Sequence, residues 1–133
     1  MHYHDTALVT VLSLLLYWVL TALVGRARGR YGISAPAISG NADFERVFRV
    51  QQNTLESLIM HLPALWLFAV YVSDPWAAAL GALWIVGRIL YARGYIAEAK
   101  KRGPGMLVSI FSTTVLLVGA LIAVSGALLK SLS

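Results

Sequence analysis

The sequence predicts an all-α integral membrane protein, a left-handed four-helix bundle made by a single domain of 133 residues. Apolar residues make up 59% of the chain and charged residues only 13%, whereas soluble domains carry about 25% charged residues. The apolar residues fall into four long segments, each close to the roughly 20 residues that a helix needs to cross a bilayer. We expect the helices at about residues 5–26, 43–71, 75–101 and 105–130.

The first predicted helix carries no charged residue between positions 7 and 24. Little charge precedes it and no small-residue cleavage signal follows, so we expect a retained span rather than a signal peptide. Arg26, Arg28 and Arg30 come next, and a segment that contains Gly, Ser and Pro runs to residue 41. This segment is expected to be an extended, exposed loop.

The other three helices are bounded by turn and cap residues. Asp43 is a candidate N-cap of the second helix, which is expected to end near Tyr71. Residues 73–75 form a tight turn, and Pro75 suits the first turn of the third helix. The Gly-Pro-Gly segment at 103–105 is expected to end that helix. The fourth helix then runs without a charge from residue 106 to 129.

Basic residues lie in two short stretches between the apolar segments. The first is the group of arginines after the first helix, and the second is at the end of the third helix: Arg93, Lys100, Lys101 and Arg102. Both stretches fall on one side of the bilayer, which the positive-inside rule makes cytoplasmic, with both termini outside. We expect a multi-pass protein of a bacterial inner membrane, with no nucleic-acid surface.

The chain has no cysteine. This excludes disulfides, thiolate metal sites and a thiol nucleophile of the protein's own, so any sulfur chemistry must come from a bound thiol. We expect no metal. Four helices of this size cannot enclose a large ligand, so a substantial site is expected between the subunits of an oligomer.

Polar residues form a stripe along the second helix, where a lipid-facing helix would be apolar. Within an arc of about 80° lie Glu45, Arg49, Asn53 and Glu56. Charged residues inside a membrane are costly and usually mark a functional site. For Asn53 and Glu56, an interhelical hydrogen-bond network is the alternative.

A second stripe lies on the third helix. Within about 60°, if the helix continues far enough, lie Trp84, Arg88, Tyr91, Tyr95 and Arg102. Arg88 either contacts a ligand or neutralises a glutamate of the second helix. The two tyrosines either line the site or belong to an interfacial aromatic belt.

Two facing stripes that are rich in arginine predict an anionic ligand that enters from the cytoplasm. Arginine binds carboxylates in a bidentate manner. Glutathione fits, because it carries two carboxylates, an amine and a thiol. A free thiol with a pKa of about 8.5 is only slightly ionised at neutral pH, and a nearby arginine favours the thiolate. Arginine would then be the key catalyst.

The segment FERVFRVQQNTLE, at residues 44–56, strongly resembles a signature of the MAPEG superfamily. This superfamily includes the microsomal glutathione transferases, leukotriene C synthase and the five-lipoxygenase-activating protein. The segment RILYARGY, at residues 88–95, resembles its second signature, Arg-x-x-Tyr-x-x-Gly-Tyr. The spacing between the two blocks also matches, so the resemblance covers essentially the whole chain.

The resemblance implies a homotrimer with glutathione sites at the subunit interfaces, open to the cytoplasm and flanked by lipid for a hydrophobic co-substrate. By motif, the residues that line or flank each site would be Arg49, Gln51, Asn53, Glu56, Arg88, Tyr91 and Tyr95. Arg102 occupies the place of the thiol-activating arginine, and Arg28 or Arg26 resembles a contributing first-loop arginine. A basic residue beside a membrane is more often only a topology signal.

The chain departs from the synthases of this superfamily around the end of the signature. Ser57 and Ile59 stand where the synthases tend to have tyrosine and proline, so the resemblance implies no eicosanoid specificity. His61 lies about 120° from Arg49 around the helix and is expected to form a hydrogen bond between helices. Pro63 is expected to kink the second helix.

The leading function is a glutathione transferase that conjugates a lipophilic electrophile, or a peroxidase that reduces a lipid hydroperoxide. The alternative is a non-catalytic lipid-binding scaffold of the same fold. A small channel or transporter is the third reading, and the absence of inverted repeats counts against it. The sequence does not specify the co-substrate, since lipid-facing apolar residues encode little about it.

Overall fold

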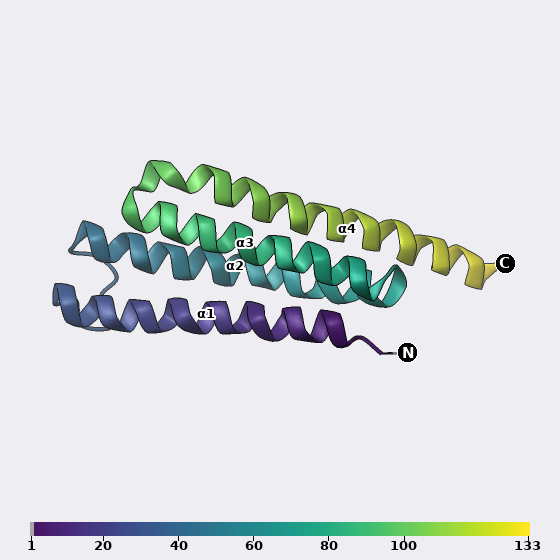
Figure 1. Ribbon diagram of the computed structural model, residues 1–133, viewed down its shortest axis with the longest axis horizontal. Coiled ribbons are helices and arrows are strands. Elements are labelled where there is room, and N and C mark those ends of the chain that lie inside the picture. Colours follow the sequence, from purple (N-terminus) through teal and green to yellow (C-terminus); the bar gives the residue numbers. More distant parts are fainter. Residues whose placement is uncertain (1) are drawn as a thin grey trace.

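Four long helices make up the bundle in the computed structural model, which describes residues 2–133 (Figure 1). They are α1 (His4–Tyr31), α2 (Ala42–Tyr71), α3 (Asp74–Ala97) and α4 (Gly103–Leu132), with the 3₁₀ helix η1 (Ala99–Arg102) between α3 and α4. Each is long and apolar enough to cross a membrane. The prediction of an all-α, multi-pass membrane protein with a four-helix bundle is therefore confirmed.

The helices run antiparallel, and α1 and α4 lie on opposite sides of the α2–α3 pair (Figure 1). Both termini lie at one end of the bundle, whereas the α1–α2 loop and η1 lie at the other. The two stretches of basic residues therefore share one end of the molecule, as the sequence predicts.

Helix α1 is longer than predicted and contains the arginines that were expected to follow it. It ends at Tyr31, where Gly32 adopts the left-handed conformation with φ 68° that commonly terminates a helix. Arginine is a good helix former and is favoured near a helix C-terminus. Arg28 also holds the following loop, because its Nη1 donates to the carbonyl oxygens of Ile33 at 3.3 Å and Ala37 at 2.7 Å.

The N-cap of α2 is Asn41, so the prediction of Asp43 as the cap is wrong. The Asn41 side chain accepts a hydrogen bond from the backbone N–H of Phe44 at 3.0 Å. Asp43 instead forms an ion pair with Arg46 on the next turn. The helix ends at Tyr71, as predicted, and Pro63 lies inside it without ending it.

The connection between α3 and α4 also differs from the prediction. Helix α3 ends at Ala97 rather than near residue 101, and the segment 103–105 begins α4 instead of ending α3. Pro104 is in the first turn of α4, where a proline costs no hydrogen bond. A Cβ atom at Gly105 would overlap the backbone of Tyr91, so the two helices meet closely here.

At the opposite end, Asp74 joins α1 to the start of α3. Its carboxylate accepts hydrogen bonds from the Thr6 backbone N–H at 2.9 Å and the Thr6 hydroxyl at 2.5 Å. The Ser73 hydroxyl caps α3 by accepting from the backbone N–H of Trp76 at 3.3 Å. The α2–α3 turn and its contact with α1 are therefore fixed by short polar side chains.

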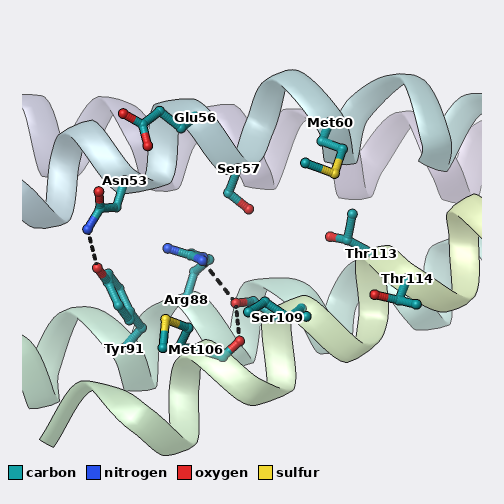
Figure 2. Close-up of a pocket in the computed structure, with 11 residues that line it drawn as sticks. Asn53, Glu56, Ser57, Met60, Arg88, Tyr91, Met106, Ser109, Thr113 and Thr114 are labelled. Carbon is teal, nitrogen blue, oxygen red and sulfur yellow. Dashed lines mark hydrogen bonds between the residues drawn. The ribbon is translucent and has the colours of Figure 1, made fainter.

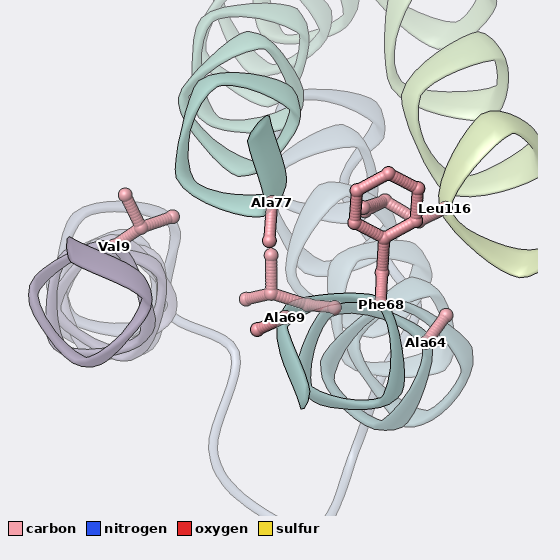
Figure 3. Packing of buried hydrophobic residues seen from close by; sticks show 7 residues of the cluster. Val9, Ala64, Phe68, Ala69, Ala77 and Leu116 are labelled. Atoms are coloured by element: carbon pink, nitrogen blue, oxygen red, sulfur yellow. The ribbon is translucent and has the colours of Figure 1, made fainter. Parts of the chain in front are cut away.

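The apolar core near this end is built from small and medium side chains (Figure 3). They are Val9, Ala64, Leu65, Phe68, Ala69, Ala77 and Leu116. A Cβ at Gly119 would lie 2.5 Å from the Phe68 ring, which shows how closely α4 approaches α2. Large apolar side chains such as Ile59 (70% exposed) and Leu121 (65% exposed) cover the outside, where lipid is the solvent.

Candidate functional site

Two adjoining pockets lie toward the η1 end of the bundle. The shallow pocket, of about 410 Å³, is lined by Arg49, Asn53, Tyr91, Tyr95, Arg102 and Met106. The deep pocket, of about 430 Å³, is lined by Asn53, Glu56, Ser57, Met60, Arg88, Tyr91, Met106, Ser109, Ile110, Thr113 and Thr114 (Figure 2). The pockets share three residues, so they adjoin along one wall.

The shallow pocket combines residues from four elements, with Met106 contributed by α4. Arg49 and Asn53 come from α2, Tyr91 and Tyr95 from α3, and Arg102 from η1. The Arg102 guanidinium carbon lies 5.5 Å from the centre of the Tyr95 ring. The sequence joined Arg102 to the tyrosine stripe only if the third helix continued that far, but α3 ends at Ala97 and the chain folds back through η1. Arg102 still meets the tyrosine stripe, because the turn returns it there.

Tyr91 forms the wall between the two pockets. Its hydroxyl oxygen accepts a hydrogen bond from Asn53 Nδ2 at 2.6 Å, which joins α3 to α2 (Figure 2). The guanidinium carbon of Arg88 lies 4.5 Å from the centre of its ring, and Tyr95 packs against it edge to face with ring centres 5.6 Å apart. Only 2% of Tyr91 is exposed. Its position is therefore fixed by contacts on several sides.

Arg88 is the most deeply placed cation of the site, with 5% of its surface exposed. Its Nη2 donates to the Ser109 hydroxyl at 3.0 Å, whereas Nε and Nη1 have no hydrogen-bond partner within residues 2–133. Glu56 lines the same pocket, but no ion pair joins it to Arg88 in this part of the chain. A buried guanidinium with unused donors is costly unless a ligand or solvent completes its hydrogen bonds.

Beyond Arg88, a chain of hydrogen bonds and ring contacts continues into the bundle. Trp84 Nε1 donates to the Ser57 hydroxyl at 3.0 Å, and its ring stacks on His61 with centres 4.3 Å apart. His61 Nδ1 lies 3.2 Å from the Thr113 hydroxyl. The expected hydrogen bond of His61 between helices is therefore confirmed, and it joins α2 to α4.

Two predicted site residues lie outside both pockets. Gln51 is buried against α1 and donates from Nε2 to the Thr21 hydroxyl at 3.1 Å. Arg28 binds the carbonyl oxygens of the α1–α2 loop and lies over the Phe44 ring at 5.1 Å. Arg26, the alternative to Arg28, lines a separate cavity between α1 and the ends of α2 and α3.

The contribution of α4 to the site was not predicted from the sequence. Ser109, Thr113 and Thr114 line the deep pocket beside Met106 and Ile110. The available signal was the spacing of four between Ser109 and Thr113, which places two hydroxyls on one face of an otherwise apolar helix. Such hydroxyls also hydrogen-bond within the helix or between helices, so the signal is weak.

Comparison with known proteins places this architecture among membrane proteins of one family. The sequence model of the MAPEG family matches residues 6–122. An uncharacterized protein of Synechocystis sp. is 54% identical over 118 residues, covering 89% of this chain and 86% of its own. Human microsomal glutathione S-transferase 2 is 40% identical over 116 residues, covering 86% and 79%. Rat leukotriene C4 synthase is 35% identical over 96 residues, covering 72% and 64%.

Proposed function

The chain belongs to the MAPEG family, and we propose on this basis that it is a membrane-bound transferase that uses glutathione as a co-substrate. The names of two relatives, microsomal glutathione S-transferase 2 and leukotriene C4 synthase, support this class of activity. The single observation that carries the proposal is the shallow pocket, where Arg49 of α2 and Arg102 of η1 line one cavity.

The chemistry of the shallow pocket suits glutathione. Two guanidinium groups can bind carboxylates, and no acidic side chain lines this pocket. We assign Arg49, Asn53 and Tyr95 to the glutathione backbone and its carboxylates. Glu56 lies one turn beyond Asn53, in the deep pocket, where its carboxylate can bind the amine.

Arg102 is proposed to activate the thiol. A guanidinium beside the sulfur stabilises the thiolate and so lowers the pKa of the thiol, which releases its proton to solvent. The thiolate then attacks a lipophilic electrophile. In conjugation a carbon–sulfur bond forms as the leaving group departs, and with a lipid hydroperoxide the sulfur attacks oxygen instead.

A homotrimer completes the proposal. Arg49 and Glu56 are exposed in the single chain, although they lie on a membrane-spanning helix. Charged side chains facing lipid are costly, and a neighbouring subunit over this face removes that cost. Arg28 and Gln51 line neither pocket of their own chain, so any contact of theirs with glutathione would be in a neighbouring subunit's site.

We further propose a bacterial inner membrane with the η1 end in the cytoplasm. Both stretches of basic residues lie at that end, in agreement with the positive-inside rule. The similarity to a Synechocystis protein supports a bacterial setting. Glutathione would then reach the shallow pocket from the cytoplasm.

Glutathione binding and conjugation test the proposal together. Detergent-solubilised wild-type protein should bind glutathione in calorimetry and conjugate it to benzyl chloride with release of chloride. Arg49→Ala should weaken both, whereas Arg93→Ala, which changes an exposed arginine of α3 outside both pockets, should change neither. No glutathione binding by a well-folded wild-type protein would contradict the enzyme and favour a lipid-binding scaffold.

A further inference from the structure

The deep pocket contains a feature that the glutathione proposal does not use. Arg88 has two hydrogen-bond donors, Nε and Nη1, without a partner among residues 2–133, although only 5% of its surface is exposed. Its Nη2 donates a hydrogen bond to the Ser109 hydroxyl. The guanidinium lies between Tyr91 and Ser109, facing the space between α2 and α4 (Figure 2).

We propose that Arg88 binds the peroxide group of a lipid hydroperoxide and stabilises the alkoxide that leaves when glutathione reduces it. The inference rests on the proposed function, which already includes hydroperoxide reduction, and it names the residue that acts on the hydroperoxide. This role also distinguishes hydroperoxide reduction from conjugation, because a substrate without oxygen would not need Arg88.

The composition of the deep pocket fits such a substrate. Its outer wall contains Met60 and Ile110, which are 57% and 51% exposed in the single chain and lie on two membrane-spanning helices, so an acyl chain can enter along the edge of the subunit contact. Its inner wall carries the guanidinium and the hydroxyls of Ser57, Ser109 and Thr113. A volume of about 430 Å³ is within the usual range for a small-molecule site.

The hydrogen-bonding groups match a peroxide more closely than a hydrocarbon or a halide. A hydroperoxide has two acceptor oxygens and one donor hydrogen. Arg88 supplies two free donors, and serine and threonine hydroxyls can accept or donate. In an apolar setting, donors directed at a developing negative charge are strongly stabilising.

The arrangement of the pockets gives the direction of the reaction. Tyr91 lines both pockets. Arg102 lies in the shallow pocket with Tyr95, whereas Arg88 lines the deep pocket, with its guanidinium carbon 4.5 Å from the centre of the Tyr91 ring. A thiolate held by Arg102 in the shallow pocket would face a peroxide held by Arg88 in the deep pocket. The attacked oxygen would lie toward the sulfur and the departing oxygen toward Arg88.

The reaction balances with glutathione as the only reductant. The thiolate attacks the terminal peroxide oxygen, so a sulfur–oxygen bond forms and the oxygen–oxygen bond breaks. The lipid alkoxide leaves against Arg88 and takes a proton from water, while the sulfur is oxidised to a sulfenic acid. A second glutathione thiolate attacks that sulfur, which gives glutathione disulfide and hydroxide. Overall, one hydroperoxide and two glutathiones give one alcohol, one disulfide and one water.

The test compares two kinds of substrate, hydroperoxides and an alkyl halide, in the full-length protein. Cumene hydroperoxide and the methyl ester of linoleic acid hydroperoxide carry a peroxide but no carboxylate, and benzyl chloride carries no oxygen. Arg88→Gln should lower kcat/KM for the hydroperoxides about 100-fold, the order expected for loss of one oxyanion donor, and far more than for benzyl chloride. Arg93→Gln, on the exposed face of the same helix, should leave both values at the wild-type level.

Two further variants guard against misfolding. Arg88→Lys keeps a cation and should restore part of the hydroperoxide activity. Ser109→Ala removes the hydroxyl that accepts a hydrogen bond from Arg88 and should selectively weaken hydroperoxide reduction. Equal losses on both substrates in folded Arg88→Gln and Ser109→Ala proteins, or no loss on either, would overturn the role of Arg88. Absence of glutathione binding in the wild type would instead contradict the proposed function itself.

Discussion

The amide nitrogen of Asn53 and the phenol oxygen of Tyr91 lie 2.6 Å apart, in a hydrogen bond that joins α2 to α3 where the two pockets meet. Thirty-eight residues separate the two in sequence. The two polar stripes predicted from the sequence therefore meet at one contact. Its loss should alter the site without unfolding the bundle.

Tyr91→Phe removes this hydrogen bond and keeps the ring that packs against Arg88 and Tyr95. A hydrogen bond of about 1 kcal/mol corresponds to about a fivefold change in affinity, so we expect glutathione to bind about fivefold more weakly. Calorimetry measures this directly. Tyr71→Phe, at the far end of α2, is the matched control, and an equal effect of both variants would contradict the assignment.

Gly105→Ala should separate α4 from α3, because the new Cβ would overlap the backbone of Tyr91. Overpacking of this kind costs about 1 to 3 kcal/mol and should lower the Tm and both activities. Gly126→Ala is the matched control, since no atom lies within 4 Å of its Cβ position. In that helix alanine should be neutral or slightly stabilising. Similar melting curves for the two variants would contradict the close contact between α3 and α4 at Gly105.

Asp74→Ala should lower the Tm and leave the catalytic properties unchanged. The variant removes the acceptor of two Thr6 hydrogen bonds that hold α1 to the α2–α3 turn, at the opposite end from the pockets. Thermal unfolding in detergent and conjugation assays check the two parts. Asp5→Ala, an exposed neighbouring acid on α1, is the control for a simple change of charge.

The absence of native cysteine makes the proposed orientation easy to test. Ser133→Cys, at the outer end of α4, should react with a membrane-impermeant thiol reagent on intact cells. Ser34→Cys, in the α1–α2 loop, should react only after the membrane is permeabilised. The reverse pattern would place the shallow pocket outside the cytoplasm.

Several parts of the fold followed directly from the sequence. A long apolar segment crosses lipid as a helix, because a helix makes its backbone hydrogen bonds within the segment. The existence and order of the four helices were therefore predictable. The ends of the helices were less predictable, because local capping decides them. Helix α1 continues several residues beyond its predicted end and stops only at Gly32, and the cap of α2 is Asn41 instead of Asp43.

The site was predictable where it lies on continuous helix. Asn53 and Tyr91 fall on the faces that helical spacing assigns to them, and they meet. Arg102 was aligned with the tyrosines on the condition that the third helix continued, but that helix ends earlier, and the contact of Arg102 with Tyr95 depends on the turn through η1. The α4 hydroxyls were not predicted, since isolated serines and threonines in an apolar helix carry little information about what faces them.

The central claim is that Arg102 activates a glutathione thiol held in the shallow pocket. Ultraviolet difference absorbance of the thiolate, recorded on purified protein with saturating glutathione, tests it most directly. We predict a thiolate signal in the wild type and in Arg93→Ala, and its loss in Arg102→Ala while calorimetry still detects bound glutathione. A full thiolate signal in Arg102→Ala would contradict the account and assign activation to another residue.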